Sequence, residues 1–583
     1  MRKKVKTLVA LGLVVCTLIG CGSQTGTSTE QEQSSQVASV QSQTQASGEE
    51  QESAYPDYLN LESYRPIVKE DEEITLKLAV KRSAHATNDL DDVWFIKFIE
   101  DELNINLEIE EVTKENMAER KNLMLASGEL PDMMIWLGFS TSDVMKYGVD
   151  EELFLPLSDY FSEELTPSIM SMLEENDAAV ALNTAPNGKM YTLPEFLDNT
   201  DYSDGSIARS RVFVDTKYLE AAGIEELPDT LDGFVDMLRK FRDLDPADLG
   251  VDEIVPVVEV NGLVKQYIQN AFGWILYNAT SVDAAWDVEM QEVVVPVLTD
   301  KYEYYLKVMN TLYSEGLLHP DYFTMDSAAV KALFSERKTG VMGNWAPYLT
   351  QPEAFDEWVS LKPLKSEWNE EGVTCIGQAY SLGKVLISAD TEYPELCMRL
   401  LDYFYSPEGS TYSYYGAPAG SDDTLGMMNG YEIVDGNFKF GDVGQYESDY
   451  VYRCNVVNLF EINFYGDLAK ETAYDLAGVK MVNTEIDSTD PDNNYRVKVK
   501  EAFTGPMEDA LPSAYVATDI SARYADLKTV INSYVTAETA KFITGQRPLS
   551  EFKDFQAELK ELGSEEYLEI VKSFYENYER PEY

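Results

Sequence analysis

The alternation of apolar and polar residues early in the chain predicts strands separated by helices. Ile74 to Val80 and Ile105 to Ile109 alternate with a period of two, which is typical of half-buried strands. Val93 to Leu103 and Ala118 to Ala126 repeat their apolar residues at helical spacing. Met133 to Trp136 is a short apolar run suited to a buried strand. This order of elements predicts an α/β fold with mainly parallel sheets.

The same alternation returns further along the chain, with no internal repeat of fixed period. Ile207 to Val214 and Thr339 to Met342 are predicted strands, and Thr230 to Leu244 is a predicted helix between them. Three later segments have mainly helical spacing: Glu395 to Tyr405, Ala522 to Thr536 and Ser550 to Tyr578. The length suffices for two or three domains or for one two-lobed body.

The first 21 residues have the pattern of an export signal. Leu8 to Gly20 is apolar and follows a basic start, but it is too short to cross a bilayer core of about 30 Å. Leu18 to Cys21 (LIGC) resembles a bacterial lipobox, which implies a lipid on Cys21; an ordinary signal peptide is the alternative. We expect a signal peptide over 1–20 and a lipid anchor with a flexible linker over 21–63, where aromatic residues are few.

Charge and residue counts exclude several classes of function. The formal net charge of −57 would repel nucleic acid and anionic headgroups, and it disfavours anionic substrates unless a local basic pocket captures them. Cys375, Cys397 and Cys454 are too widely spaced for a disulfide framework, so we expect small buried residues, with one disulfide as the alternative. His85 and His319 form no metal or triad pattern. No cofactor, metal or catalytic residue is predicted.

Six short motifs occur along the chain: Asn122 to Asp132 (NLMLASGELPD), Leu155 to Leu157, Asn187 to Pro194 (NGKMYTLP), Asp215 to Gly223, Gly316 to Asp321 and Phe542 to Leu549 (FITGQRPL). In their order and number they resemble the family 1 extracellular solute-binding proteins, in particular the large LplA-like lipoproteins of carbohydrate ABC importers. The resemblance covers about Tyr64 to Glu579. It implies a type II periplasmic-binding-protein-like fold, with two α/β lobes and a ligand cleft at their hinge.

The resemblance also implies an arrangement of lobes and a set of partners. We expect 64–195 in the first lobe, 196–375 in the second, and 376–583 to supply hinge crossings and helices that complete both. The expected partners are a carbohydrate, in particular an oligosaccharide, and the permease subunits of an ABC importer. The protein is expected to be a monomer on the extracytoplasmic face of the cell membrane, which it touches only through its lipid.

Two acidic stretches invite comparison with calcium loops. Relatives carry a calcium-loop-like sequence where this chain has Asp245 to Pro256, but the side chains of Ala247 and Leu249 cannot coordinate an ion. Asp487 to Asn494 has Tyr495 where a calcium loop needs glycine. We therefore predict no metal at either stretch.

Candidate ligand-binding residues follow the predicted strand ends, because parallel α/β sheets bind ligands beyond their carboxyl ends. They are Lys81, Arg82, His85, Trp136, Phe139, Tyr191, Glu195, Asn344 and Trp345. Trp345 leads, since Phe334 to Trp345 resembles a stretch of maltose-binding-type receptors that ends in a sugar-stacking tryptophan; a core tryptophan at a domain seam is the alternative. Weaker aromatic candidates are Trp274, Trp286, Tyr380, Tyr412, Tyr414 and Tyr415, for which packing is the competing explanation.

Three other functions remain open from the sequence. A secreted glycoside hydrolase or lyase would need two positioned carboxylates, which an acidic chain can supply anywhere. A receptor or adhesin without transport and a receptor for peptides or other non-sugar solutes are also compatible with the motifs, because family membership does not fix ligand chemistry.

Overall fold

The computed structural model describes residues 55–83, 85–196, 209–259, 262–376, 380–434, 437–446, 449–458, 464–479, 489 and 491–576. The predicted signal peptide and Cys21 lie outside these residues. The compact unit that holds both large sheets begins at Tyr55.

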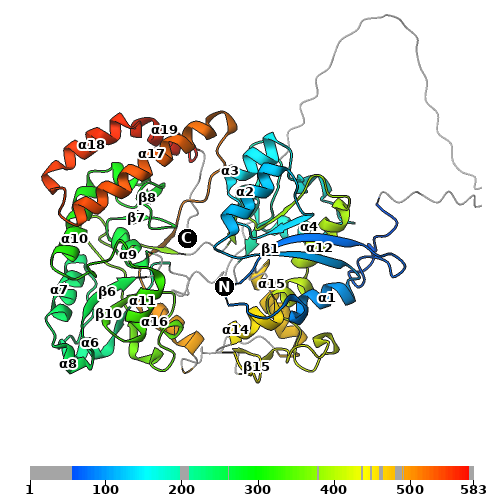
Figure 1. The fold of residues 1–583 in the computed structure, drawn as a ribbon, viewed down its shortest axis with the longest axis horizontal. Helices are drawn as coiled ribbons and strands as arrows, with labels where there is room; N and C mark the ends of the chain where they lie inside the picture. Colours follow the sequence, from blue (N-terminus) through cyan, green and yellow to red (C-terminus); the bar gives the residue numbers. More distant parts are fainter. Residues whose placement is uncertain are drawn as a thin grey trace, which may run out of the picture. The chain divides into compact units, whose positions relative to one another are not determined.

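One four-stranded sheet is built from the predicted strand–helix–strand pattern, and we call the part of the chain around it the first lobe (Figure 1). Its strand order is β14 (Val385–Ile387), β3 (Met133–Ile135), β1 (Thr75–Lys81) and β2 (Asn106–Val112). β1 is parallel to both β2 and β3, whereas β14 is antiparallel to β3. Helices α1 (Trp94–Glu102) and α2 (Met117–Ser127) connect the parallel strands, as the sequence predicts.

A second four-stranded sheet defines the second lobe (Figure 1). Its order is β11 (Trp358–Ser360), β5 (Val212–Asp215), β10 (Thr339–Gly343) and β6 (Val255–Glu259). Only β10 and β6 pair in parallel; β5 is antiparallel to both β10 and β11. This departs from the mainly parallel arrangement expected. β5 is the first strand that the chain forms in the second lobe, and it runs in the direction opposite to β10.

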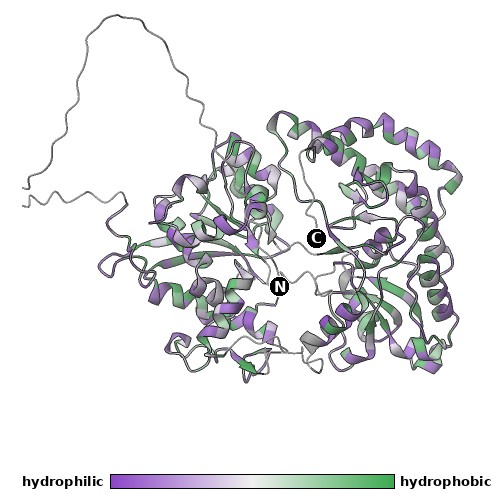
Figure 2. Cartoon of the chain, turned by 180° about the vertical axis from the view of Figure 1, so that it is seen from behind, coloured by the Kyte–Doolittle hydropathy of each residue, from purple (hydrophilic) through white to green (hydrophobic). Residues whose placement is uncertain are grey.

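The helices agree with the predicted segments. In the first lobe, α4 (Pro167–Glu175) packs against α12 (Pro394–Tyr405). In the second lobe, the longer helices are α7 (Leu231–Arg242), α10 (Lys301–Ser314), α16 (Pro491–Ala502), α17 (Thr518–Ile543), α18 (Phe552–Glu561) and α19 (Ser564–Ser573). Figure 2 shows hydrophilic and hydrophobic residues alternating along the helices. Within the described segments, none of the helices combines the length and hydrophobicity that crossing a bilayer requires.

Each lobe draws its hydrophobic core from separate stretches of the chain. The first-lobe cores take buried residues from between 59 and 196 and again between 385 and 473. The second-lobe cores take theirs from between 212 and 375 and again between 499 and 571. Residues beyond 376 therefore contribute to both cores, and the exact predicted boundaries stay predictions. Cys375, Cys397 and Cys454 are buried free thiols, which confirms their assignment as small core residues.

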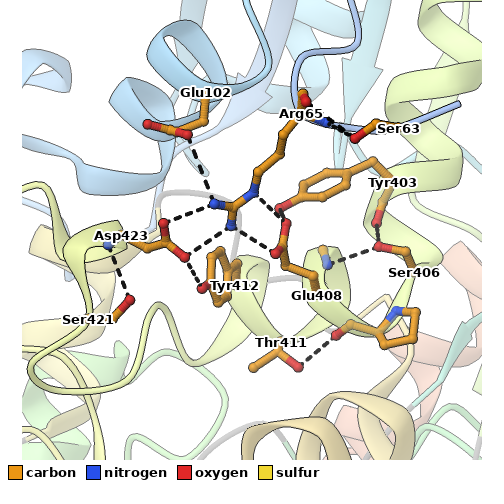
Figure 3. A network of polar contacts seen from close by, with 12 residues as sticks. Ser63, Arg65, Glu102, Tyr403, Ser406, Glu408, Thr411, Tyr412, Ser421 and Asp423 are labelled. Carbon is orange, nitrogen blue, oxygen red and sulfur yellow. Dashed lines mark hydrogen bonds and ion pairs between the residues drawn. The ribbon is translucent and has the colours of Figure 1, made fainter. Parts of the chain in front are cut away.

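A polar network around Arg65 fastens the first lobe (Figure 3). The guanidinium donates to Glu408 Oε1 at 2.9 Å and to both carboxylate oxygens of Asp423 at 2.9 and 3.1 Å. Its plane lies over Phe98, 4.7 Å from the ring centroid. Tyr412 donates a further hydrogen bond to Asp423 at 2.6 Å, and the hydrogen bonds from Arg65 lower the pKa of that carboxyl group.

Candidate ligand-binding site

Trp345 lies just beyond the carboxyl end of β10, where the sequence predicts it. Asn344 is buried, and its side-chain oxygen accepts a hydrogen bond from the Trp345 backbone N–H at 2.8 Å. The Asn344 amide group also lies 3.5 Å from Thr350 Oγ1. Asn344 therefore shapes the turn that presents Trp345, whose own side chain is partly exposed.

Two arginines lie against the Trp345 ring. The guanidinium carbons of Arg209 and Arg211 are 5.2 and 5.6 Å from its centroid. Arg209 also lies over Tyr277 at 4.1 Å, and Arg211 over Tyr495 at 5.3 Å. These distances suit cation–π attraction. We call these five residues the Trp345 cluster.

The position of the arginines follows from the direction of β5. Arg211 immediately precedes that strand, and Val212 pairs with Gly343 in antiparallel register. The residues before β5 therefore lie beside the residues after β10. Arg211 Nη1 donates to the Trp345 carbonyl oxygen at 3.3 Å, and burial lowers the pKa of the Arg211 guanidinium. Sequence reasoning missed both arginines because it searched only after strands, as a parallel sheet would require.

In the first lobe, Trp136 also follows a strand end, and a cation lies over its ring. Lys81 Nζ is 3.7 Å from the Trp136 centroid. The Trp136 backbone has φ 56° and donates its N–H to the Lys384 carbonyl oxygen at 2.7 Å. Glu195 is buried, accepts a hydrogen bond from Ser381 Oγ at 3.0 Å and lies 3.8 Å from Lys384 Nζ. Each lobe thus places a tryptophan and a cation together at a strand end.

Arg82 and His85 have structural contacts. Arg82 donates to the Asn88 carbonyl oxygen at 2.6 Å and forms an ion pair with Glu111 at 2.6 Å, so it fastens the loop after β1. The His85 side chain is exposed and meets Tyr450 edge-on at 5.4 Å. Arg82 therefore uses donors within its own lobe, while His85 stays a prediction as a ligand residue.

Two predicted ligand residues belong to hydrophobic cores instead, which corrects the sequence-based assignment. Trp274 is 0% exposed in β7 (Trp274–Ile275), stacked on Phe272 at 5.4 Å. Tyr415 is 7% exposed and stacks on Phe438 at 4.1 Å. A side chain enclosed by its own lobe presents no face to a ligand.

Most of the remaining candidates have side chains that pack within the protein, and the side chain of Tyr380 is not among those described. Tyr412 belongs to the Arg65 network, and Tyr414 lies under the Arg453 guanidinium at 3.9 Å. Tyr380 begins β13 (Tyr380–Ser381), and its backbone pairs with that of Phe196 in β4 (Glu195–Phe196). The side chain of Tyr380 is outside the described residues. Trp286 and Phe139 are partly buried and pack against a core, whereas Tyr191 is itself a buried core residue, which corrects its assignment as a ligand residue. Tyr191 does not follow a regular strand as the sequence analysis expected, because Met190 before it forms an isolated bridge with Thr184.

One cavity of about 270 Å³ is lined by residues of both lobes. Ser140 to Ser142 contribute from the first lobe, and Tyr277, Asn278 and Ala514 lie across from them. Thr141 Oγ1 donates to the Ala514 carbonyl oxygen at 2.9 Å. Because Tyr277 belongs to the Trp345 cluster, this cavity adjoins it. Other cavities, of about 580 and 930 Å³, are lined by second-lobe residues alone.

A lysine ammonium group from another part of the chain lies beside the first calcium-loop-like stretch. Asp245 caps the short helix α8 (Pro246–Leu249) by accepting the Ala247 N–H at 2.9 Å. Lys338 Nζ lies 2.9 Å from Asp252 and 2.8 Å from Glu336. The described residues contain no cluster of three metal-binding side chains. In the second stretch, Asp487 to Asn494, residues 487, 488 and 490 and the side chains of 491–493 are outside the described residues.

Two α/β lobes with aromatic side chains at strand ends and a cavity between them define a two-lobed solute-binding protein. The chain matches the family described as bacterial extracellular solute-binding protein over residues 86–411, and it belongs to that family. Its extracytoplasmic assignment follows from the same match.

The chain is similar to proteins whose names state a carbohydrate ligand. The fructooligosaccharide ABC transporter substrate-binding protein FusA of Streptococcus pneumoniae is 22% identical over 87% of this chain and 91% of its own. The structure of FusA with kestose matches with a TM-score of 0.68 and 20% identity, covering 86% of this chain and 99% of FusA. The polygalacturonan/rhamnogalacturonan-binding protein YtcQ of Bacillus subtilis is 24% identical over 43% of this chain and 46% of its own.

Proposed function

We propose that this protein is a lipid-anchored receptor that captures an oligosaccharide between its lobes and delivers it to an ABC permease. The observation that carries the proposal is the partly exposed Trp345, held at a strand end beside a cavity that both lobes line. A sugar ring packs its C–H face on such an aromatic plane, while polar side chains nearby meet its hydroxyls.

The two lobes give the proposal a mechanism. Trp345 of the second lobe and Trp136 of the first lobe are separate platforms, and a ligand that contacts both favours the closed arrangement by its differential affinity. No covalent step is required, so we propose no enzymatic activity. The carbohydrate specificity of FusA and YtcQ supports a saccharide over a peptide.

Binding and enzymatic action are separated by one experiment. The purified protein is screened by thermal unfolding against neutral and acidic oligosaccharides and against peptides. Ligand at 100 times its dissociation constant should stabilise the protein by about 2.7 kcal/mol. Recovery of the glycan intact supports a receptor, whereas cleaved glycan supports a tethered enzyme. A response to peptides alone contradicts the proposed ligand class.

The proposed lipid anchor has its own test. Cys21→Ser removes the thiol that would carry the lipid, and the protein should then leave the membrane fraction for the medium. Metabolic labelling with palmitate should mark the unchanged chain and not the variant. Retention of Cys21→Ser at the membrane would contradict the anchor without affecting the ligand.

A further inference from the structure

Arg209 differs from other arginines of this acidic chain in what surrounds it. The chain has 103 acidic and 46 basic residues, so a carboxylate partner is easily found. Described arginines that form ion pairs with carboxylates are Arg65, Arg82, Arg120, Arg239, Arg242, Arg337, Arg399, Arg523 and Arg547. No carboxylate among the described residues lies within ion-pair distance of Arg209, which is surrounded by aromatic rings instead.

The Arg209 guanidinium lies between two of these rings. Its central carbon is 4.1 Å from the Tyr277 centroid and 5.2 Å from that of Trp345. Its Nε is buried, and no described residue accepts a hydrogen bond from it. Arg399 and Arg547 also have a buried Nε without an acceptor, but each of those guanidinium groups forms an ion pair with a carboxylate. Arg209 forms none with a described residue, so a group from outside can complete its bonding.

The backbone of Arg209 is fixed independently of its side chain. Its N–H donates to the Cys375 carbonyl oxygen at 2.9 Å, in β12 (Thr374–Ile376). Strand β17 (Met507–Asp509) pairs with β12 and carries Glu508 and Asp509, yet neither of these carboxylates forms an ion pair with the Arg209 guanidinium. The cation is therefore held in place while its charge remains available.

We propose that the Trp345 cluster selects acidic saccharides, with the carboxylate of a uronic acid residue on Arg209 and the sugar ring stacked on Trp345. The proposal rests on the proposed receptor function and names its substrate class. The planar guanidinium fork matches a carboxylate, with which it can form two parallel hydrogen bonds. The aromatic face serves any sugar, so Arg209 decides between charged and neutral ones.

The strongly negative net charge does not oppose this assignment. Exposed charges are screened beyond about 8 Å at physiological ionic strength, so the distant acidic surface acts weakly at the cluster. The groups next to the ligand are Arg209 and Arg211, with Arg496 beside Tyr495 at 5.7 Å from its ring centroid. A local basic pocket of this kind is what an anionic substrate needs on an acidic protein.

Titration calorimetry on the purified protein tests the proposal with matched ligands. The probes are trisaccharides of galacturonic, mannuronic and guluronic acid, their full methyl esters and neutral galactotriose. Methyl esterification removes the charge and keeps the ring. At least one free acid should bind ten or more times more tightly than its ester.

Variants assign the selectivity to one side chain. Arg209→Gln should weaken binding of the acid at least tenfold and change binding of the ester less than twofold. Arg209→Lys should keep part of the acid affinity, because the charge remains and only the fork geometry is lost. Arg242→Gln removes the same charge from outer helix α7 of the same lobe and should change neither affinity.

The outcomes separate this inference from the receptor function itself. Tighter binding of neutral saccharides or esters than of any acid overturns the acidic specificity and leaves the receptor standing. Unchanged acid affinity in a folded Arg209→Gln also overturns it. Failure to bind any saccharide overturns both proposals.

Discussion

Arg65 in the first lobe and Arg209 in the second lobe both lie against aromatic rings, but their N–H groups meet different partners. Arg65 lies over Phe98 and its N–H groups are taken up by Glu408 and Asp423 (Figure 3). Arg209 lies over Tyr277 and Trp345, and its buried Nε has no acceptor among the described residues. The first arrangement is complete within the protein; the second awaits a group from outside.

The difference separates two uses of the same residue type. A guanidinium enclosed by carboxylates stabilises the fold, because removing it leaves negative groups without a partner. A guanidinium enclosed by rings contributes less to the fold and keeps its donors for a ligand. If the two arginines divide in this way, substitutions around them should change stability and binding unequally.

The largest effect is expected for Arg65→Ala. We expect the free energy of unfolding to fall by about 3 kcal/mol, at the lower end of the cost of breaking a buried ion pair. The side chains of Arg65 and Asp423 are each 26% exposed, which moderates the loss. Urea unfolding followed by circular dichroism measures it. Arg242→Ala, on a mostly surface ion pair, should cost less than about 1 kcal/mol, and an equal loss in both would contradict the structural role of Arg65.

Trp345→Ala should act on binding. We expect the affinity for the bound oligosaccharide to fall by about 2 kcal/mol, roughly 30-fold in Kd, because the stacking face is lost. Tyr304→Ala is the control, since Tyr304 is 51% exposed on α10. Calorimetry gives both affinities. A Trp345→Ala variant that binds normally but unfolds at a lower temperature would make Trp345 a core residue.

Asp423→Asn should have a smaller effect that depends on pH. Hydrogen bonds from Arg65 lower the pKa of Asp423 in the folded state, so its ionised form stabilises the fold above the unfolded pKa of about 3.9. That stability is lost as pH falls through the folded pKa. Asp423→Asn should therefore cost about 1 kcal/mol at pH 7 and less at pH 3. Urea unfolding at pH 7 and pH 3 measures the difference in free energy of unfolding between the unchanged protein and the variant. A difference that is larger at pH 3 than at pH 7 would contradict the lowered pKa of Asp423.

The smallest effect is expected for the stability of Arg209→Gln. Arg209 has no ion pair to a described carboxylate and loses only its cation–π contacts, so the free energy of unfolding should fall by less than about 1 kcal/mol. Arg211→Gln should cost more, because Arg211 Nη1 donates to the Trp345 carbonyl oxygen. Urea unfolding curves of the two variants, recorded under the same conditions, measure both losses of stability. If Arg209→Gln lost as much stability as Arg65→Ala, the distinction between a structural Arg65 and a ligand-binding Arg209 would be wrong.

Local patterns sufficed to predict the parallel strands of the first lobe and the helices that connect them. The strand at Ile74 to Val80 and the helix at Val93 to Leu103 each differ from β1 and α1 by one residue at either end. Gly128 stops α2 in the left-handed region at φ 71°, a conformation that glycine adopts without a steric cost. These signals depend on residues close together in sequence, which is why one sequence sufficed.

Features that depend on distant segments could not be predicted in this way. The antiparallel direction of β5 is set by where the chain enters the second sheet, and with it the placement of Arg209 and Arg211 beside Trp345. Trp274 and Trp345 both stand among apolar residues in sequence, yet one is enclosed by its lobe and the other is partly exposed. Trp345 and Trp136 stay predictions as ligand residues.

The interleaved cores affect when the chain can fold relative to its export. The first-lobe core includes Ala473 and the second-lobe core includes Val571, so neither can close until most of the polypeptide has been synthesised. Contacts between residues far apart in sequence also form slowly. A chain that must wait for its own end stays extended for longer, which suits an extracellular protein that threads a membrane pore before it folds.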